Sequence, residues 1–117
     1  EQMFVEKEAC QIVNKAVDGG KRICAVGTTT MRVLESASAT DGYLKEFEGW
    51  TNKFIFPPYD FTIPSAMVTN FHMPESTLLM LVAAFGGYEL IMNAYDEALE
   101  QGYRFGTYGD AMLIISK

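Results

Sequence analysis

Basic residues are scarce in this sequence, and one long stretch has none. The chain has 9 Lys and Arg residues against 15 Asp and Glu residues, which gives a formal net charge of −6 at pH 7. No Lys or Arg lies between Lys53 and Arg104. Proteins that grip nucleic acid neutralise phosphates with these two residue types. This stretch is therefore excluded as a nucleic-acid-binding surface.

Long apolar runs and cysteines are also few. The longest apolar run, residues 78–85, falls far short of the roughly 20 residues that span a bilayer. The first six residues lack the basic start and apolar stretch of a signal peptide. Cys10 and Cys24 are too few for a disulfide framework or a cysteine metal site, and their apolar surroundings predict buried thiols. We therefore expect a cytoplasmic protein that does not contact a membrane.

The rest of the sequence alternates helical and strand patterns. Residues 6–17 carry apolar side chains at helical spacing, and a glycine pair ends the pattern. Residues 23–26 predict a short strand buried on both faces, and the helix after it is predicted to be capped by Thr28 or Thr29. Further strands are predicted at residues 54–56, 66–68 and 109–115, and further helices at residues 76–85 and 88–101. These patterns predict an α/β fold with a mixed sheet covered by helices.

The start of the chain indicates a piece of a longer protein. The first residue is not Met, and no strand is predicted before the first helix to cover its apolar face. We therefore expect residues 1–117 to be one domain from the C-terminal part of a longer chain. Apolar surface exposed by such a truncation is expected to favour self-association.

Three motifs together carry a resemblance to a known family. They are AVGTTTMRVLES at residues 25–36, TNFHMPESTLLMLV at residues 69–82 and GYRFGTYGDAML at residues 102–113. In this order they resemble the motifs of the S-adenosylmethionine:tRNA ribosyltransferase-isomerases, and the likeness runs over essentially the whole chain. Glu75 departs from the family pattern, because a basic residue is common at that position. Any contact of position 75 with a phosphate or a carboxylate is therefore in doubt.

The resemblance implies an unusual reaction on tRNA. S-adenosylmethionine is the co-substrate and donates its ribosyl group to 7-aminomethyl-7-deazaguanine in tRNA, which gives epoxyqueuosine with loss of adenine and methionine. No metal is implied. The resemblance also implies a larger barrel-like α/β domain, a monomeric full-length enzyme, and tRNA contacts mainly in an N-terminal part that this chain lacks. We expect the chain to be inactive alone, because a reaction built on positioning needs all of its positioning groups.

The first motif offers candidates for binding the donor. A helix that follows a strand ending in glycine presents unpaired N–H groups and a partial positive charge. The hydroxyls of Thr28, Thr29 and Thr30 and the guanidinium of Arg32 are predicted to hold the carboxylate of the donor's methionine portion, or a phosphate. The structural alternative is a threonine-capped helix with Arg32 as a surface charge.

The second motif contains His72, the single histidine of the chain. The implied reaction removes a proton beside a sulfonium, a task that suits a group titrating near neutrality. Asn70, two residues earlier, is predicted to point to the same side. Pro74 and the Ser76-Thr77 cap are predicted to fix the loop and line the site. The alternative is a histidine that only holds the turn.

The third motif adds Tyr108 and Asp110. Tyr108 is a candidate for stacking on a base, although aromatic residues beside a strand more often belong to the core. Asp110 is the second catalytic candidate, because an unpaired buried carboxylate would be costly. It is expected to pair with Arg32, to cap a turn, or to hold a ribose hydroxyl or the attacking ammonium.

Two other function classes remain. One is a small stand-alone α/β module that binds a nucleotide or a partner without catalysis, which tight binding by the chain alone would favour. The other is an ordinary methyltransferase domain. The sequence disfavours it, because no G-x-G-x-x-G loop follows the first predicted strand.

Overall fold

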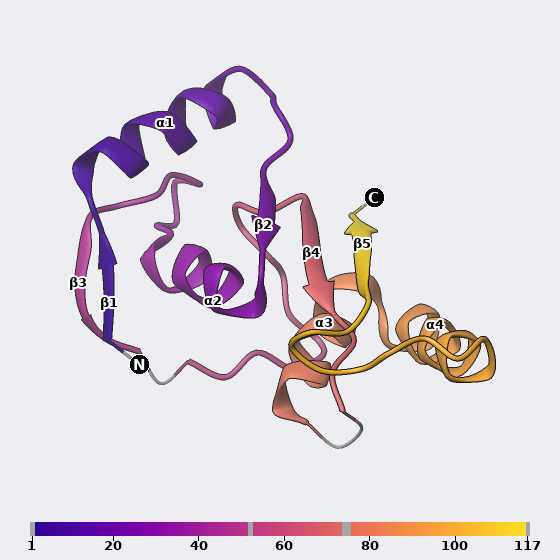
Figure 1. Ribbon diagram of the computed structural model, residues 1–117. Helices are drawn as coiled ribbons and strands as arrows, with labels where there is room; N and C mark the ends of the chain where they lie inside the picture. Colours follow the sequence, from indigo (N-terminus) through magenta and orange to yellow (C-terminus); the bar gives the residue numbers. More distant parts are fainter. Residues whose placement is uncertain (1, 52, 74–75, 117) are drawn as a thin grey trace.

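The chain forms two separate sheets with helices packed around them (Figure 1). The computed structural model describes residues 2–51, 53–73 and 76–116. Within these residues the order of elements is β1 (Gln2–Val5), α1 (Lys7–Asp18), β2 (Cys24–Val26), α2 (Thr28–Ala37), β3 (Phe47–Trp50), β4 (Ala66–Asn70), α3 (Thr77–Gly86), α4 (Tyr88–Glu100) and β5 (Ala111–Ile115). The prediction of an α/β fold with a mixed sheet is confirmed.

The mixed sheet has the order β2-β4-β5. β2 runs parallel to β4, with Ala25 opposite Met67, and β5 runs antiparallel to β4, with Ile114 opposite Met67. These three side chains are buried, at 0%, 0% and 6% exposure. They form the inner face of the sheet, because residues paired across strands point to the same side.

The outer face of this sheet is exposed, which corrects two predictions. Val26 is 67% exposed and Leu113 is 61% exposed, so β2 and β5 are each buried on one face only. Cys24 lies on the same outer face and is exposed, whereas Cys10 is buried as predicted. An uninterrupted apolar run therefore did not mean burial on both sides.

The second sheet was not predicted. β1 pairs antiparallel with β3, with Met3 opposite Gly49 and Val5 opposite Phe47. Met3 and Val5 are buried, so β1 covers the core as a short strand in front of α1. Each strand has four residues, and β3 contains a glycine, which leaves little sequence signal.

The predicted strand at residues 54–56 is wrong. This segment has no regular structure, although Phe54 and Phe56 are exposed and Ile55 between them is buried. The alternation resembles a strand, but no neighbouring segment pairs with it among the described residues. Alternating burial predicts which side chains face the core without establishing a hydrogen-bonded ladder.

α1 turns Cys10 and part of the predicted apolar stripe toward the core, since Val13, Ala16 and Val17 are half-buried. Ile12 is 72% exposed, whereas Cys10 is buried. The helix is fixed by Asn14, whose Nδ2 donates to the Leu44 carbonyl at 2.9 Å and whose Oδ1 accepts from the Leu44 amide at 2.8 Å. These two hydrogen bonds help to fix which face of α1 turns toward the core. The spacing of apolar residues did not predict them.

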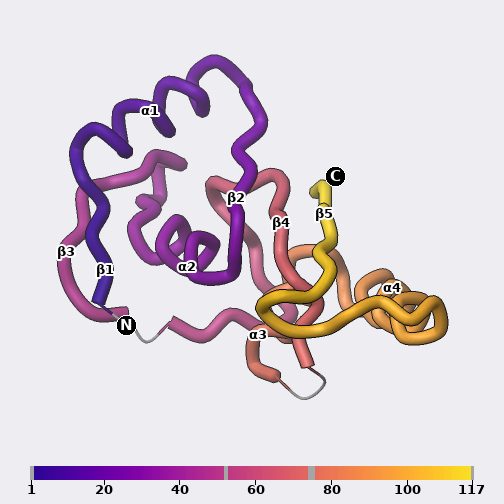
Figure 2. The backbone as a smooth tube through the Cα atoms, in the orientation of Figure 1, coloured from indigo at the N-terminus to yellow at the C-terminus, as the bar shows by residue number. Residues whose placement is uncertain are grey.

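α2 lies between the two sheets and contacts β1, β2 and α3 (Figures 1 and 2). It contributes Met31 and Leu34 to the core, at 0% and 8% exposure. α3 and α4 pack against each other through buried residues that include Val82 and Ile91. The core therefore connects both sheets through one central helix.

α3 and α4 were also compared with membrane spans. No single helix among the described residues is long and apolar enough to cross a bilayer. α3 and α4 reach that length and composition only as a pair, and the chain bends by 118° between them.

Candidate functional site

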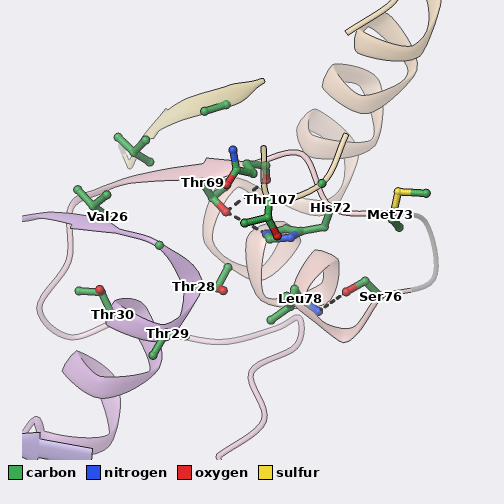
Figure 3. A pocket seen from close by; sticks show the side chains of 15 residues that line it. Val26, Thr28, Thr29, Thr30, Thr69, His72, Met73, Ser76, Leu78 and Thr107 are labelled. Atoms are coloured by element: carbon green, nitrogen blue, oxygen red, sulfur yellow. Dashed lines mark hydrogen bonds between the residues drawn. The ribbon is translucent and has the colours of Figure 1, made fainter. Parts of the chain in front are cut away.

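A cavity of about 620 Å³ lies where β2 and β4 end (Figure 3). Both strands are parallel, so their carboxyl ends meet at this edge, the usual position of ligand sites in open α/β sheets. Its lining residues are Val26, Gly27, Thr28, Thr29, Thr30, Val68, Thr69, Asn70, His72, Met73, Ser76, Leu78, Gly106, Thr107 and Ala111. The volume is in the range of small-molecule sites.

The threonine-rich start of α2 and the loop that carries His72 both line this cavity. Thr30 of the first motif and Thr69 of the second are 39 residues apart in the sequence. The parallel pairing of β2 with β4 brings the two motifs together. The start of α2 and the loop that carries His72 therefore share one cavity. The roles of the individual residues stay predictions.

The N-terminus of α2 differs from the prediction. Gly27, not Thr28 or Thr29, is the N-cap residue, and no side chain caps the helix. Gly27 has φ 96°, a left-handed value that glycine adopts without strain. Its amide donates to the Val68 carbonyl at 2.8 Å, which joins the loop to β4. The first N–H groups of α2 therefore open toward the cavity without a capping side chain.

Thr28 is the most buried of the three threonines at the start of α2. Only 8% of the residue is exposed, and its side chain lines the cavity (Figure 3). The hydroxyl makes no hydrogen bond with any residue in the described part of the chain. The oxygen is not among the fully buried side-chain atoms without a partner, so it reaches the solvent in the cavity. Thr28 is therefore available to a ligand or a water molecule in the cavity.

His72 is held from two sides. Its Nε2 lies 2.9 Å from the Thr69 hydroxyl, and its backbone amide donates to the Tyr95 phenol at 3.0 Å. Desolvation lowers the pKa of the His72 imidazole below its ordinary value. The ring is therefore neutral at neutral pH, the state in which one nitrogen can accept a proton.

Asn70 and Ser76 also line the cavity. The Asn70 amide donates to the Gly109 and Asp110 carbonyls, each at 3.3 Å, which ties β4 to the loop before β5. The Ser76 hydroxyl accepts from the Leu78 amide at 3.1 Å and is the N-cap of α3, as predicted. Thr77 is the first residue of α3 and is not a lining residue. The predictions for Pro74 and Glu75 lie outside the described residues.

Besides Thr77, three predicted site residues do not line the cavity. Tyr108 is 99% exposed, so neither core packing nor a place in the cavity describes it. Asp110 is exposed, and its Oδ2 accepts from the Arg104 amide at 2.7 Å, so of the predicted alternatives it caps a turn. The Arg32 guanidinium hydrogen-bonds to the Thr29 hydroxyl at 3.4 Å, beside the cavity lining.

Sequence reasoning missed several lining residues. Thr69 and Thr107 belong to recognised motifs but were not singled out, and Met73 and Leu78 supply apolar lining. A hydroxyl three residues before the single histidine was the available signal for Thr69. Thr107 had none, because its loop is brought to the end of β4 by hydrogen bonds between distant segments, such as that from the Gly106 amide to the Phe71 carbonyl at 2.8 Å.

An aromatic cluster supports the loop that carries His72. The Phe71 ring contacts the rings of Tyr95, Tyr103 and Phe105 at centroid distances of 5.2–5.7 Å. Tyr95 and Phe105 also contact each other at 5.6 Å. Core packing, which was favoured for the aromatic residues of the third motif, is confirmed for Phe105.

The chemistry of the cavity is that of hydroxyls, one imidazole and apolar walls. No group of three or more His, Cys, Asp or Glu residues that could hold a metal ion occurs in residues 2–51, 53–73 and 76–116. The arrangement can hydrogen-bond a small polar molecule at the start of α2 and exchange a proton at His72.

The chain is similar in sequence and fold to known proteins. Residues 1–114 match the family described as "Queuosine biosynthesis protein". The chain is 72% identical over its full length to an S-adenosylmethionine:tRNA ribosyltransferase-isomerase of Bacteroides fragilis, and 70% identical to that of Phocaeicola vulgatus. It is also similar to the crystal structure of S-adenosylmethionine tRNA ribosyltransferase from Thermotoga maritima, with 49% identity and a TM-score of 0.90. That alignment covers 96% of this chain and 39% of the other. The chain spans 33% of the length of the two curated relatives.

Proposed function

The chain belongs to the queuosine biosynthesis protein family, and we propose that it forms part of an S-adenosylmethionine:tRNA ribosyltransferase-isomerase. In this proposal the residues that line the cavity at the ends of β2 and β4 form one wall of the site for S-adenosylmethionine. The observation that carries the proposal is the meeting of the threonine corner of α2 with His72 in one cavity at the edge of a parallel strand pair.

The start of α2 is proposed to hold the carboxylate of the donor. Its uncapped N–H groups and partial positive charge favour an anion. The unpartnered Thr28 hydroxyl adds a donor at the same place, with Thr29 and Thr30 beside it. Arg32 contributes positive charge from the first turns of the helix without lining the cavity.

His72 is proposed to accept the proton that leaves the carbon beside the sulfonium. Its lowered pKa keeps the imidazole neutral and able to accept a proton. Asn70 and Ser76 are proposed to line the donor site. Asp110 and Tyr108 are exposed and do not line the cavity, so a direct role for them requires a substrate that extends beyond it.

tRNA is proposed to bind mainly through the part of the enzyme that this chain does not include. The stretch between Lys53 and Arg104 has no basic residue, and the chain carries a net charge of −6. Electrostatic binding of phosphates requires Lys and Arg. The larger barrel-like domain and the monomeric state of the full-length enzyme stay predictions, as does self-association of the isolated chain.

The test is a titration of the isotope-labelled chain with S-adenosylmethionine, followed by nuclear magnetic resonance. We expect weak binding, with a Kd of roughly 1 mM, and shifts of the Thr28, Thr69 and His72 signals. We also expect no ribosyl transfer to tRNA by the chain alone. Shifts confined to residues outside the cavity, or none at the solubility limit of the ligand, would overturn the proposal.

The second candidate is the stand-alone binding module. The volume of the cavity, about 620 Å³, is the observation that favours it, because it lies in the range of small-molecule sites. It predicts that the chain alone binds a nucleotide with a Kd of about 1 μM or below. The same titration therefore separates the two functions by affinity.

A further inference from the structure

Thr69 is a buried hydroxyl of β4 that has no role in the proposal so far. It is 4% exposed, and its Oγ1 lies 2.9 Å from His72 Nε2 (Figure 3). It also lies 3.3 Å from the Asn70 carbonyl oxygen, in the geometry of a donor. The hydroxyl therefore stands between a carbonyl, which only accepts, and an imidazole nitrogen, which either donates or accepts.

Counting protons separates the two tautomers of His72. A hydroxyl has one proton to donate and accepts through its lone pairs. If Nε2 carries the imidazole proton, Nε2–H donates to Thr69, and the Thr69 hydroxyl donates to the Asn70 carbonyl, so both contacts are hydrogen bonds. If Nδ1 carries it, the Thr69 proton must go to Nε2, and the contact with the carbonyl is lost. The first arrangement makes one more hydrogen bond in a buried place, where each bond matters more.

The rest of His72 is held so that the second nitrogen remains available. The backbone amide is fixed by Tyr95, which is 5% exposed and packed on Phe71. His72 lines the cavity, and its Nδ1 makes no hydrogen bond with the described residues. The titratable groups on the segments packed against this loop include the phenols of Tyr95 and Tyr103 and the Asp110 carboxylate, which accepts from the Arg104 backbone amide.

We propose that Thr69 is a positioning residue that holds His72 in the tautomer with the proton on Nε2, so that Nδ1 accepts the proton of the bound ligand. The identity of that ligand rests on the proposed function. The C–H bond beside the sulfonium breaks, its proton forms the Nδ1–H bond, and its electron pair stays on the carbon. The imidazolium keeps its Nε2–H bond to Thr69, so Thr69 supports both protonation states.

The single histidine allows a direct test on the ligand-free chain. Long-range ¹H–¹⁵N correlation spectra of the imidazole at neutral pH show which nitrogen carries the proton. We expect the proton on Nε2. A spectrum with the proton on Nδ1 would overturn the proposal, whether or not any variant folds.

Three variants separate positioning from general structure. Thr69→Val keeps the shape but removes the hydroxyl, and we expect a mixture of tautomers or a broadened imidazole signal. Thr69→Ser keeps the hydroxyl, and we expect the wild-type spectrum. Thr107→Val is the matched control, because Thr107 lines the same cavity and makes no hydrogen bond with His72 in the described chain. A Thr69→Val spectrum identical to wild type would overturn the role of Thr69.

Failure here is distinguishable from failure of the proposed function. The tautomer is read without S-adenosylmethionine, so an absent binding signal in the titration leaves the tautomer result intact. Conversely, binding in the cavity with the proton on Nδ1 would sustain the donor site and remove Thr69 from its mechanism.

Discussion

The two ends of α2 differ in whether a polar side chain has hydrogen-bond partners within the protein. Near its C-terminus, Glu35 is 4% exposed, and its carboxylate accepts from the Thr62 amide at 3.0 and 3.1 Å and from the Ile63 amide at 3.3 Å. At its N-terminus, Thr28 is 8% exposed and makes no hydrogen bond with the described residues. The hydrogen bonds of Glu35 are therefore all supplied by the protein, whereas Thr28 lines a cavity and has no hydrogen-bond partner in the described chain.

The difference separates structure from function within one helix. The Glu35 carboxylate anchors the irregular segment at residues 59–63 to α2, because backbone amides far along the chain find their acceptor there. Desolvation, followed by the charge of Glu35 and a hydrogen bond to it, raises the pKa of Tyr59 to about 12. A buried group whose partners are supplied by the fold stabilises the fold, whereas an unpartnered hydroxyl that reaches a cavity is available to a ligand.

Removal of the Glu35 carboxylate should have the largest effect. Glu35→Ala leaves the Ile63 amide buried without an acceptor and releases the segment, and we expect a loss of about 3 kcal/mol in the free energy of unfolding. Urea denaturation followed by circular dichroism measures it. Glu35→Gln is the control, because its amide oxygen still accepts one hydrogen bond and should lose about half as much. A Glu35→Ala variant as stable as wild type would remove the contrast between the two ends.

Thr28→Val should leave stability almost unchanged and weaken binding of S-adenosylmethionine. Its effect should be smaller than that of Glu35→Ala. We expect unfolding to change by less than about 0.5 kcal/mol, because no hydrogen bond within the described chain is lost. Binding of S-adenosylmethionine should weaken by about fivefold to tenfold, equivalent to about 1 kcal/mol. The titration used for the proposed function measures the second quantity, and denaturation measures the first. A variant that loses stability but binds normally would make Thr28 a structural residue.

The pH dependence of stability should show the smallest effect. Burial lowers the pKa of His72 in the folded chain, so between the unfolded value, about 6.5, and the lower folded value the unfolded state binds more protons. Stability should therefore be complete above about pH 6.5 and fall as the pH drops through that range. Urea midpoints at about pH 7.5 and about pH 5.5 measure the decrease.

His72→Gln is the control for this pH dependence. Tyr95 does not titrate in this range, because burial raises the pKa of its phenol. The Gln variant should lose most of the decrease between the two pH values. An equal decrease in wild type and variant would show that His72 is not the group responsible.

Much of the candidate site was predictable, because its residues lie in local motifs. The glycine after an apolar run and the threonines that open the next helix predicted the strand–loop–helix corner. The single histidine beside a helix cap predicted the second corner. Arg32, Asp110 and Tyr108 have suitable chemistry as well, yet they lie outside the cavity lining, since residue type does not report the direction of a side chain.

Glu35 shows why other features were not predictable. It appears in the sequence as one charged residue of an amphipathic helix, and its partners lie 27 and 28 residues later in a segment without regular structure. The exposed outer face of the mixed sheet was not predictable for a similar reason. Val26 and Leu113 are apolar and exposed, so composition alone did not identify which sides of β2 and β5 face the core.

The α/β class, the helices and the motifs that place the chain in its family follow from local sequence patterns, because helical periodicity and glycine at turns act over a few residues. Only the tertiary structure decided that β1 pairs with β3, that Gly27 caps α2 and that Thr69 contacts His72. These features depend on hydrogen bonds and packing between distant segments, whose geometry is fixed only when the strands pair and the core closes.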